Sequence, residues 1–261
     1  MNRPDGGSRT AQGPRTRAES MIFDLLRRFN GFLAPLVIRF GFLNGIIIRV
    51  REGERSLWIR PFSLDWFVLK EIFERNIYAA RIGNGDMVVD LGAHVGLFSV
   101  YAASRGAMVM AYEPDPDNLE VFRVNVASNG LVRRISIVPC AVWKEDGTKE
   151  MYFPRNKGNN SFFPFGTTGR KVQVPCVSLT KILDAIPGEI SVLKVDIEGA
   201  EYDVLDGADL SKVRQICLEY HTHSNLGPRL RPLFESLRKD GFSVSVLGEY
   251  ALSGYAFAIR E

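Results

Sequence analysis

Beyond residue 82, apolar runs alternate with amphipathic segments. Five runs have no polar alternation and predict strands over Met87 to Leu91, Ala107 to Tyr112, Ile135 to Val142, Ile190 to Asp196 and Val213 to Tyr220. The segments between them predict helices over Val95 to Ser104, Pro116 to Ser128 and around Thr180 to Ala185. Because strands without alternation are buried on both faces, we expect an α/β fold whose mostly parallel sheet carries helices on both faces.

Two regions depart from this alternation. Strand-like runs over Lys149 to Phe153 and Lys171 to Leu179 enclose a polar loop, Asn156 to Arg170, which indicates a β-hairpin insertion. At the end of the chain, only seven residues separate Phe242 to Leu247 from Tyr255 to Ile259. This link is too short for a helical crossover, so the last pair of strands is predicted to be antiparallel.

The first 82 residues form a separate lead-in. Residues 1–20 contain almost no apolar side chains and predict a disordered basic tail. Residues 21–82 predict an amphipathic segment, a β-hairpin around Arg51 to Arg55, and a capped helix that follows Ser63-Leu64-Asp65. Residues 83–261 then form the main domain.

Charge is concentrated in the lead-in. Residues 1–60 carry a net charge of +6, whereas the remaining 201 residues carry −3. The body is therefore not expected to bind nucleic acid. Within residues 21–50, Arg27, Arg28, Arg39, Asn44 and Arg49 interrupt the apolar run, which argues against a spanning helix. Packing on the domain, or peripheral contact with an anionic membrane, are the two interpretations of this segment.

Residues 1–20 contain no apolar stretch of the kind a signal peptide requires, so export is not expected, and none of the three cysteines belongs to a C-x-x-C pair. We expect a cytoplasmic protein, either free or peripheral to the membrane. The oligomeric state is open.

The turn after the first strand of the main domain is the strongest candidate for a cofactor site. The segment Asp90-Leu91-Gly92-Ala93-His94-Val95-Gly96 lies between a strand and a helix, where open α/β sheets bind ligands. His94 occupies the position at which a dinucleotide fingerprint needs glycine, which favours a cationic ligand such as S-adenosylmethionine over a pyrophosphate. Glu113 ends the second strand, 23 residues after Asp90, at the spacing of a ribose-binding carboxylate.

The fourth and fifth strands carry the candidate catalytic groups. Lys194 lies inside an apolar strand and requires a partner, and alternation places it on the same side as Asp196 and Glu198. His221 ends the neighbouring strand, and imidazole suits proton transfer near neutral pH. The alternatives are a structural ion-pair cluster and a hydrogen-bonded surface histidine.

These motifs resemble the FkbM-type S-adenosylmethionine-dependent methyltransferases. The resemblance rests on VVDLGAHVGLFSVYA, AYEPDPDNLEVFRVNVASNG, the Asn159-Asn160-Ser161 loop, LKVDIEGAEYDVLDG and LEYH, in that order, and extends from about Ile46 to Glu261. It implies a Rossmann-like class I methyltransferase fold with seven strands, the last antiparallel. It also implies methyl transfer, usually to a hydroxyl of a sugar, glycan, glycolipid or other secondary metabolite.

We therefore expect an O-methyltransferase that acts on a small-molecule or glycan acceptor. A nicotinamide-dependent oxidoreductase or epimerase, and a non-catalytic Rossmann-like module, are the alternatives. The expected cofactor contacts are Asp90, Gly92, Ala93, His94, Gly96, Glu113, Ala141 and Asp196.

His221 is the expected general base, with Asp196 orienting the acceptor and Lys194 placing Asp196. Glu198 and the loop residues Asn160 and Ser161 are the expected acceptor contacts, and the loop Asn156 to Arg170 is expected to close over the acceptor. A divalent metal ion held by Asp196, Glu198 and an added His or Asn is the rival mechanism.

Overall fold

A computed structural model describes residues 47–61, 63–78, 80–154, 160–163, 169–223, 226–249 and 252–260. The expected tail over residues 1–20, the amphipathic segment up to residue 46, and most of the loop 156–170 lie outside the described residues. The expected domain boundary at residue 82 stays a prediction.

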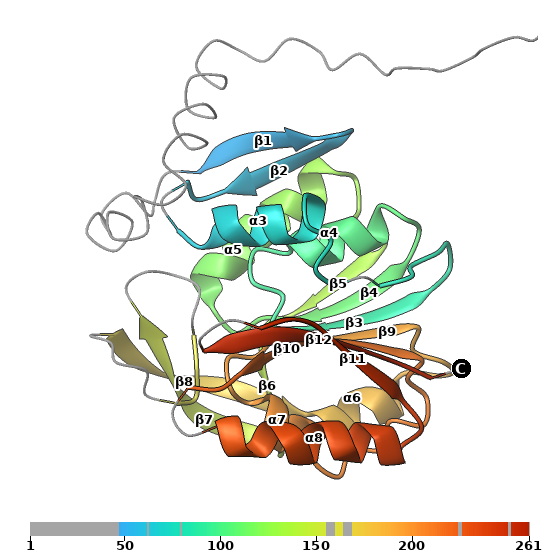
Figure 1. The fold of residues 1–261 in the computed structure, drawn as a ribbon. Coiled ribbons are helices and arrows are strands. Elements are labelled where there is room, and N and C mark those ends of the chain that lie inside the picture. The colour runs from blue at the N-terminus through green and yellow to red at the C-terminus, as the bar shows by residue number, and fades with distance from the viewer. Residues whose placement is uncertain are drawn as a thin grey trace, which may run out of the picture.

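The centre of the fold is a seven-stranded sheet (Figure 1). Its strands, in chain order, are β3 (Met87–Leu91), β4 (Met108–Tyr112), β5 (Ile135–Val138), β9 (Val192–Val195), β10 (Gln215–His221), β11 (Ser243–Glu249) and β12 (Ser253–Ile259). Their order across the sheet is β11-β12-β10-β9-β3-β4-β5. β12 runs antiparallel to the other six strands, which share one direction, because the short link from β11 allows no crossover. The predicted mostly parallel sheet with an antiparallel last strand is confirmed.

Helices cover both faces of this sheet (Figure 1). On one face lie α3 (Asp65–Phe73), α4 (Leu97–Ala103) and α5 (Pro116–Ser128); on the other lie α6 (Leu179–Ala185), α7 (Glu201–Leu205) and α8 (Gly227–Lys239). Alternation along β3 divides its side chains between two cores, with Val88 on the first face and Val89 on the second. The sequence pattern did not predict α7 or α8; α7 has only five residues, and α8 contains Pro232 in its interior.

The predicted lead-in hairpin is confirmed as β1 (Ile48–Glu52) and β2 (Arg55–Ile59). Two asparagines at α5 and its end hold the hairpin through hydrogen bonds to its backbone. Each side-chain amide pairs with the N–H and C=O of one hairpin residue, as a neighbouring strand would. Asn125 accepts from the Trp58 amide (2.6 Å) and donates to the Trp58 carbonyl (3.0 Å), and Asn129 does the same at Ser56. The helix predicted after Ser63-Leu64-Asp65 is confirmed as α3. The Ser63 hydroxyl accepts from the amide of Asp65, the first residue of the helix (3.1 Å), while Leu64 at the cap position makes no side-chain bond.

The predicted strand over Ile135 to Val142 is wrong as a single element. It divides into β5 and β6 (Ala141–Trp143), which belong to different sheets. Pro139 lies between them and has no amide hydrogen, so it cannot continue the ladder. β6 joins β7 (Gly147–Pro154) and β8 (Gly169–Ser178) in a three-stranded sheet, in which β7 and β8 form the predicted hairpin insertion.

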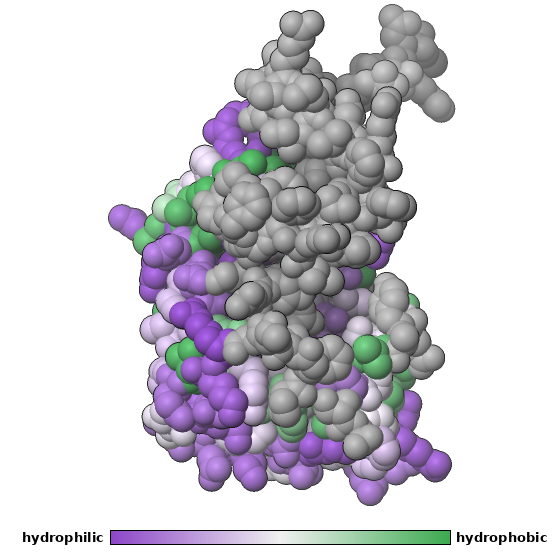
Figure 2. All heavy atoms as spheres, turned by 90° about the vertical axis from the view of Figure 1, so that its left-hand side faces the viewer, coloured by the Kyte–Doolittle hydropathy of each residue, from purple (hydrophilic) through white to green (hydrophobic). Residues whose placement is uncertain are grey.

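On the face seen in Figure 2, the visible part of the described surface is largely hydrophilic, with separate apolar patches. Within the described ranges, no helix is long and apolar enough to cross a membrane.

Candidate functional site

A cavity of about 540 Å³ opens at the carboxyl ends of the parallel strands. Its wall includes Gly92 after β3, Glu113 after β4, Asp196 after β9 and His221 at the end of β10. Helix α3 and the turn before β12 form the opposite side, through residues such as Phe67 and Leu252. The sheet therefore brings together four chain segments that the sequence analysis selected separately, at the place where open α/β sheets bind ligands.

Two glycines shape the first turn. Gly92 has φ +77°, and a Cβ atom there would collide with the carbonyl oxygen of Asp196. Gly96 has φ +78°, and a Cβ atom there would collide with the Phe122 ring. Gly92 lines the cavity, whereas Gly96 packs against α5. The expectation that Gly96 lines the cavity is thus corrected, because its missing side chain makes room for Phe122 and not for a ligand.

Asp90 also supports the site from behind. Its carboxylate is fully buried, with Oδ2 accepting from the Ser99 hydroxyl (2.7 Å) and Oδ1 lying 3.1 Å from Nζ of Lys194. The expectation that Asp90 lines the cavity is corrected, because its carboxylate is buried against Ser99 and Lys194. Lys194 in turn donates to the Gly92 carbonyl (2.8 Å) and lies 3.5 Å from Oδ2 of Asp196. Lys194 therefore has the predicted partner, and it ties the glycine turn to Asp196.

Glu113 lies on the cavity wall and is held by the surrounding backbone. Its carboxylate accepts hydrogen bonds from the amides of His94 (2.8 Å) and Asp115 (2.8 Å), and from Nδ2 of Asn118 (3.1 Å). Burial raises the pKa of Glu113 to about 7, although His94 and the hydrogen bonds oppose this shift. A ligand that donates to Glu113 would favour its ionised form.

The lead-in reaches this carboxylate through a buried network. Arg60, after β2, donates to both oxygens of Asp65 and to Oδ1 of Asn118 (2.7 Å), which itself contacts Glu113. His94 adopts φ 54° and places its Nε2 atom 3.2 Å from Oδ1 of Asp65. Since the hairpin and α3 hold two neighbours of Glu113, the lead-in is part of the site in structural terms.

His221 lies between carboxylates. Its Nδ1 atom is 2.7 Å from Oε1 of the fully buried Glu201, and its Nε2 atom is 3.2 Å from Oε2 of Glu198. Burial lowers the pKa of His221, but Glu201 and then Glu198 outweigh burial and hold it well above its ordinary value. The two carboxyl groups therefore favour the protonated imidazole in the ligand-free chain.

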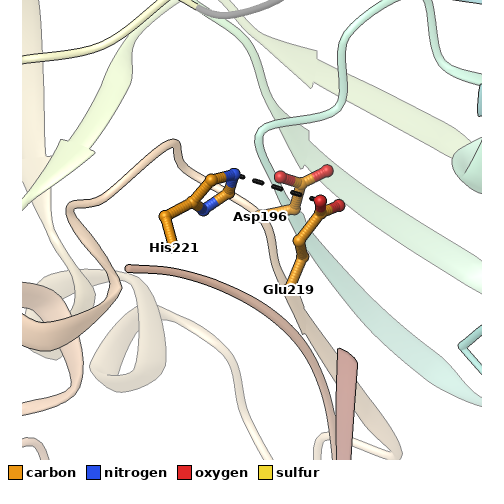
Figure 3. Close-up of side chains that lie close together, drawn as sticks. All are labelled: Asp196, Glu219 and His221. Atoms are coloured by element: carbon orange, nitrogen blue, oxygen red, sulfur yellow. Dashed lines mark ion pairs between the residues drawn. The ribbon is translucent and has the colours of Figure 1, made fainter. Parts of the chain in front are cut away.

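Asp196 and His221 face one another together with Glu219, a residue that the sequence analysis missed (Figure 3). One ligand atom from each of the three lies within 4.8 Å of the others. Burial raises the pKa of Glu219 well above its ordinary value, and Asp196 raises it further. Glu219 precedes His221 by two residues in β10, so strand alternation could have placed both on one face.

Aromatic residues complete this end of the cavity, and no local sequence signal points to them. Tyr78 donates to Oδ2 of Asp196 (3.3 Å), and its ring lies under Nζ of Lys194. Tyr255, on β12, donates to Oε1 of Glu71 on α3 (3.0 Å). Both contacts join segments far apart in the chain, so only the folded structure brings them together.

The insertion contributes the remaining wall. Asn160 and Ser161 line the cavity, as do Ala141 on β6 and Phe162, whose ring packs edge-on against Trp143 with centroids 4.8 Å apart. Ser161 donates its only hydroxyl hydrogen to the Glu198 carbonyl (2.6 Å) and accepts from the Phe163 amide (3.1 Å). Its hydroxyl holds the insertion to the turn after β9 and can only accept from a ligand.

This site suits a ligand that is cationic at one end and a nucleoside at the other. Among the described residues, the carboxyl groups of Asp196, Glu198, Glu201 and Glu219 form ion pairs with two side chains, His221 and Lys194, so four acidic groups share two cationic partners. Glu113 and apolar residues of the β6 segment and the insertion line the same cavity, and a carboxylate beside an apolar wall suits a ribose and a base. S-adenosylmethionine, with its sulfonium, amino group and adenosine, has this distribution of chemistry.

Comparisons with known proteins agree with the geometry. Residues 90–244 match the methyltransferase FkbM domain. Over 217 residues the chain is 30% identical to methyltransferase sdnD of Sordaria araneosa, covering 69% of this chain and 82% of that protein. It is 26% identical, also over 217 residues, to the 31-O-demethyl-FK506 methyltransferase FkbM of Streptomyces tacrolimicus, covering 68% and 82%.

Among solved structures, a precorrin-6y C5,15-methyltransferase from Geobacter metallireducens GS-15 is similar with a TM-score of 0.46 and 15% identity, covering 73% of this chain and 88% of that one. The domain match spans more than half of the chain and includes the glycine turn, Glu113, Asp196 and His221. The chain therefore belongs to the FkbM family of S-adenosylmethionine-dependent methyltransferases.

Proposed function

We propose that this methyltransferase transfers its methyl group to a hydroxyl oxygen of a sugar, glycan, glycolipid or other secondary metabolite. The observation that carries the proposal is His221, whose Nδ1 atom is held by Glu201 while its Nε2 atom lies at the cavity with Asp196 and Glu219. A hydroxyl is a weak nucleophile until it loses its proton, so a base at this position suits an oxygen acceptor. The name of the Streptomyces tacrolimicus relative, which refers to a 31-O-demethyl compound, supports oxygen.

The bound cofactor supplies a carbon activated by the adjacent sulfonium. His221 accepts the hydroxyl proton at Nε2, which makes the acceptor oxygen nucleophilic toward the methyl carbon that the bound cofactor would supply, with the neutral thioether as the leaving group. Asp196 orients the acceptor by accepting a hydrogen bond from another donor group of that molecule, because the reacting hydroxyl gives its one hydrogen to His221. Lys194 and Tyr78, which both contact Asp196, hold that carboxylate in place.

A protonated imidazole in the ligand-free chain is compatible with this role. A cationic ligand beside Asp196 and Glu219 would lower the pKa of His221, because like charges disfavour the protonated form. Glu198, 3.2 Å from Nε2 of His221, must give up that contact when the acceptor hydroxyl enters.

A divalent metal ion is the second candidate for activating the hydroxyl. The donor group that favours it is Asp196, Glu219 and His221, so the expected pair Asp196 and Glu198 is corrected: Glu198 turns its carboxylate to His221 instead. Such an ion would acidify a bound hydroxyl, and His221 would then be a ligand and not a base.

The direct test is incubation of the full chain with methyl-labelled S-adenosylmethionine and fractions of extracted glycans, glycolipids and small hydroxylated metabolites. The expected product carries the label in an alkali-stable methyl ether. Label found only on nitrogen or carbon would contradict the oxygen acceptor. Thermal stabilisation by S-adenosylhomocysteine and not by NAD would separate the methyltransferase from the nicotinamide-dependent alternative.

A further inference from the structure

The side-chain amide of Asn160 has a hydrogen-bond partner at its nitrogen and none at its oxygen. It is 8% exposed and lies on the cavity wall between β7 and β8. Its Nδ2 atom donates to Oδ2 of Asp115 (3.0 Å), while its Oδ1 atom is buried without a hydrogen-bond partner. The carboxylate of Asp115 can only accept, so the amide orientation follows from chemistry. A buried acceptor left unpaired costs about 1–3 kcal/mol, which points to a ligand that donates to it.

The partner of Asn160 indicates which end of the cavity this ligand occupies. Asp115 follows Glu113 by two residues, and its amide donates to Oε1 of Glu113 (2.8 Å). Asn160 is therefore tied to the loop after β4, at the carboxylate placed for a ribose. His221 and Asp196, which surround the proposed acceptor oxygen, end β10 and follow β9 instead.

The neighbouring wall is apolar. Ala141, Val142, Met151 and Phe162 line the same cavity and are all buried. A purine fits such a wall, whereas a polyhydroxylated acceptor would leave its hydroxyls unpaired there. Both the free oxygen and its surroundings suit a nucleoside.

We propose that Asn160 binds the nucleoside of the methyl donor, with Oδ1 accepting a hydrogen bond from an O–H or N–H group of the adenosine. The insertion β7–β8 then completes the cofactor site, and the expected role of Asn160 as an acceptor contact changes accordingly. This inference rests on methyl donor binding in this cavity with its ribose at Glu113, and it does not depend on the proposed oxygen acceptor. The donor group is a ribose hydroxyl or the 6-amino group of adenine.

Calorimetric titration of the full chain with S-adenosylhomocysteine tests the proposal without knowledge of the acceptor. Asn160→Ala is expected to weaken binding by about tenfold, the size of one buried hydrogen bond. Asn160→Ser, which removes the amide but keeps a small polar side chain, should weaken binding similarly and guards against misfolding of the first variant. Thermal unfolding without ligand reports whether each variant is folded.

Analogues identify the donor group. S-adenosylhomocysteine lacking the 2′-hydroxyl, the 3′-hydroxyl or the 6-amino group is titrated against wild type and Asn160→Ala. For the group that Asn160 contacts, the difference between the two proteins should disappear, while it persists for the other analogues. A tenfold difference that persists for all three analogues would overturn the proposal.

A second result would also overturn it: unchanged S-adenosylhomocysteine affinity in both folded variants, with a raised KM for an acceptor once one is known. The variant Glu113→Ala separates this failure from failure of the proposed site. If Glu113→Ala loses affinity and Asn160→Ala does not, only the assignment of Asn160 is wrong. If the wild type itself does not bind, the cofactor site is wrong.

Discussion

The Nδ1 atom of His221 lies 2.7 Å from Oε1 of Glu201, and this contact joins the wall of the cavity to a fully buried carboxylate. Glu201 is the first residue of α7, whereas His221 is the last residue of β10. A carboxylate at the start of a helix therefore orients the imidazole at the end of a strand. An acceptor of the Nδ1 hydrogen leaves Nε2 as the atom that exchanges a proton with a ligand.

Replacing Glu201 by glutamine removes the charge and keeps an oxygen at the contact. Because Glu201 helps to hold the pKa of His221 above its ordinary value, we expect the acid limb of the kcat profile against pH to move to lower pH in Glu201→Gln. The exposed Glu120, changed to glutamine, is the matched control and should leave the profile in place. An acid limb at the same pH in all three proteins would contradict the role of Glu201.

Removing the His221 imidazole, together with a chelator test, distinguishes the general-base mechanism from the metal-ion mechanism. His221→Ala should lower turnover about 10²- to 10⁴-fold, the usual contribution of a general base, while S-adenosylhomocysteine affinity stays within about threefold. In the wild type, a chelator should leave turnover unchanged. Loss of activity with chelator, restored by magnesium, would instead favour the ion held by Asp196, Glu219 and His221.

Glu113 should make the ligand-free protein less stable at alkaline pH. Its pKa is about 7 in the folded chain, against an ordinary value of 4.5, so the folded form holds a proton that the unfolded form has lost between these values. The stabilisation is fully present below pH 4.5 and is lost as the pH rises through 7, and amounts to at most about 3 kcal/mol. Urea unfolding at pH 5 and pH 8 should show a smaller decline in Glu113→Gln than in wild type.

The same residue should control cofactor affinity. Glu113→Ala is expected to weaken S-adenosylhomocysteine binding by at least tenfold, because a hydrogen bond between a charged group and a ribose is lost. Unchanged affinity measured by calorimetry would remove Glu113 from the cofactor site.

The glycine turn gives a prediction for stability. Gly96→Ala should lower the free energy of unfolding by about 2–4 kcal/mol, since the methyl group meets the Phe122 ring and an L-residue is strained at φ +78°. Gly130→Ala is the matched control: its φ is +68°, but no atom lies within 4 Å of the new methyl group, so only the strain of about 1–2 kcal/mol remains. Equal urea midpoints for the two variants would contradict the packing role of Gly96.

The basic lead-in gives a prediction that comes from sequence alone. Residues 21–50 are expected to bind anionic vesicles weakly, with about 1 kcal/mol for each basic residue near the surface at low salt. Co-sedimentation with phosphatidylserine vesicles should fall when residues 1–45 are removed, and should fall for the full chain in high salt. Equal sedimentation with and without these residues would refute membrane contact through this segment.

The sequence by itself determined the order of the main-sheet strands and of helices α3 to α6, and the position of the glycine turn, although it predicted neither α7 nor α8. Local periodicity is sufficient for this, because a strand buried on both faces and an amphipathic helix each leave their own pattern. Strand β3 and helix α5 have the predicted bounds, and the seven residues after Leu247 required an antiparallel end. Likewise, the position of Lys194 inside an apolar strand predicted that its ammonium group has a partner.

Only the tertiary structure decided which of these residues face the cavity. Asp90 and Gly96 both lie in the segment predicted to bind the cofactor. Asp90 is buried and paired with Lys194, and Gly96 leaves space for the Phe122 ring. Glu201 and Tyr78 reach His221 and Asp196 across long separations in the chain, which no local pattern encodes. The role of a side chain in a site depends on whether its neighbours fill the space around it and pair its charge. Those neighbours come from distant parts of the chain and meet only when the sheet forms.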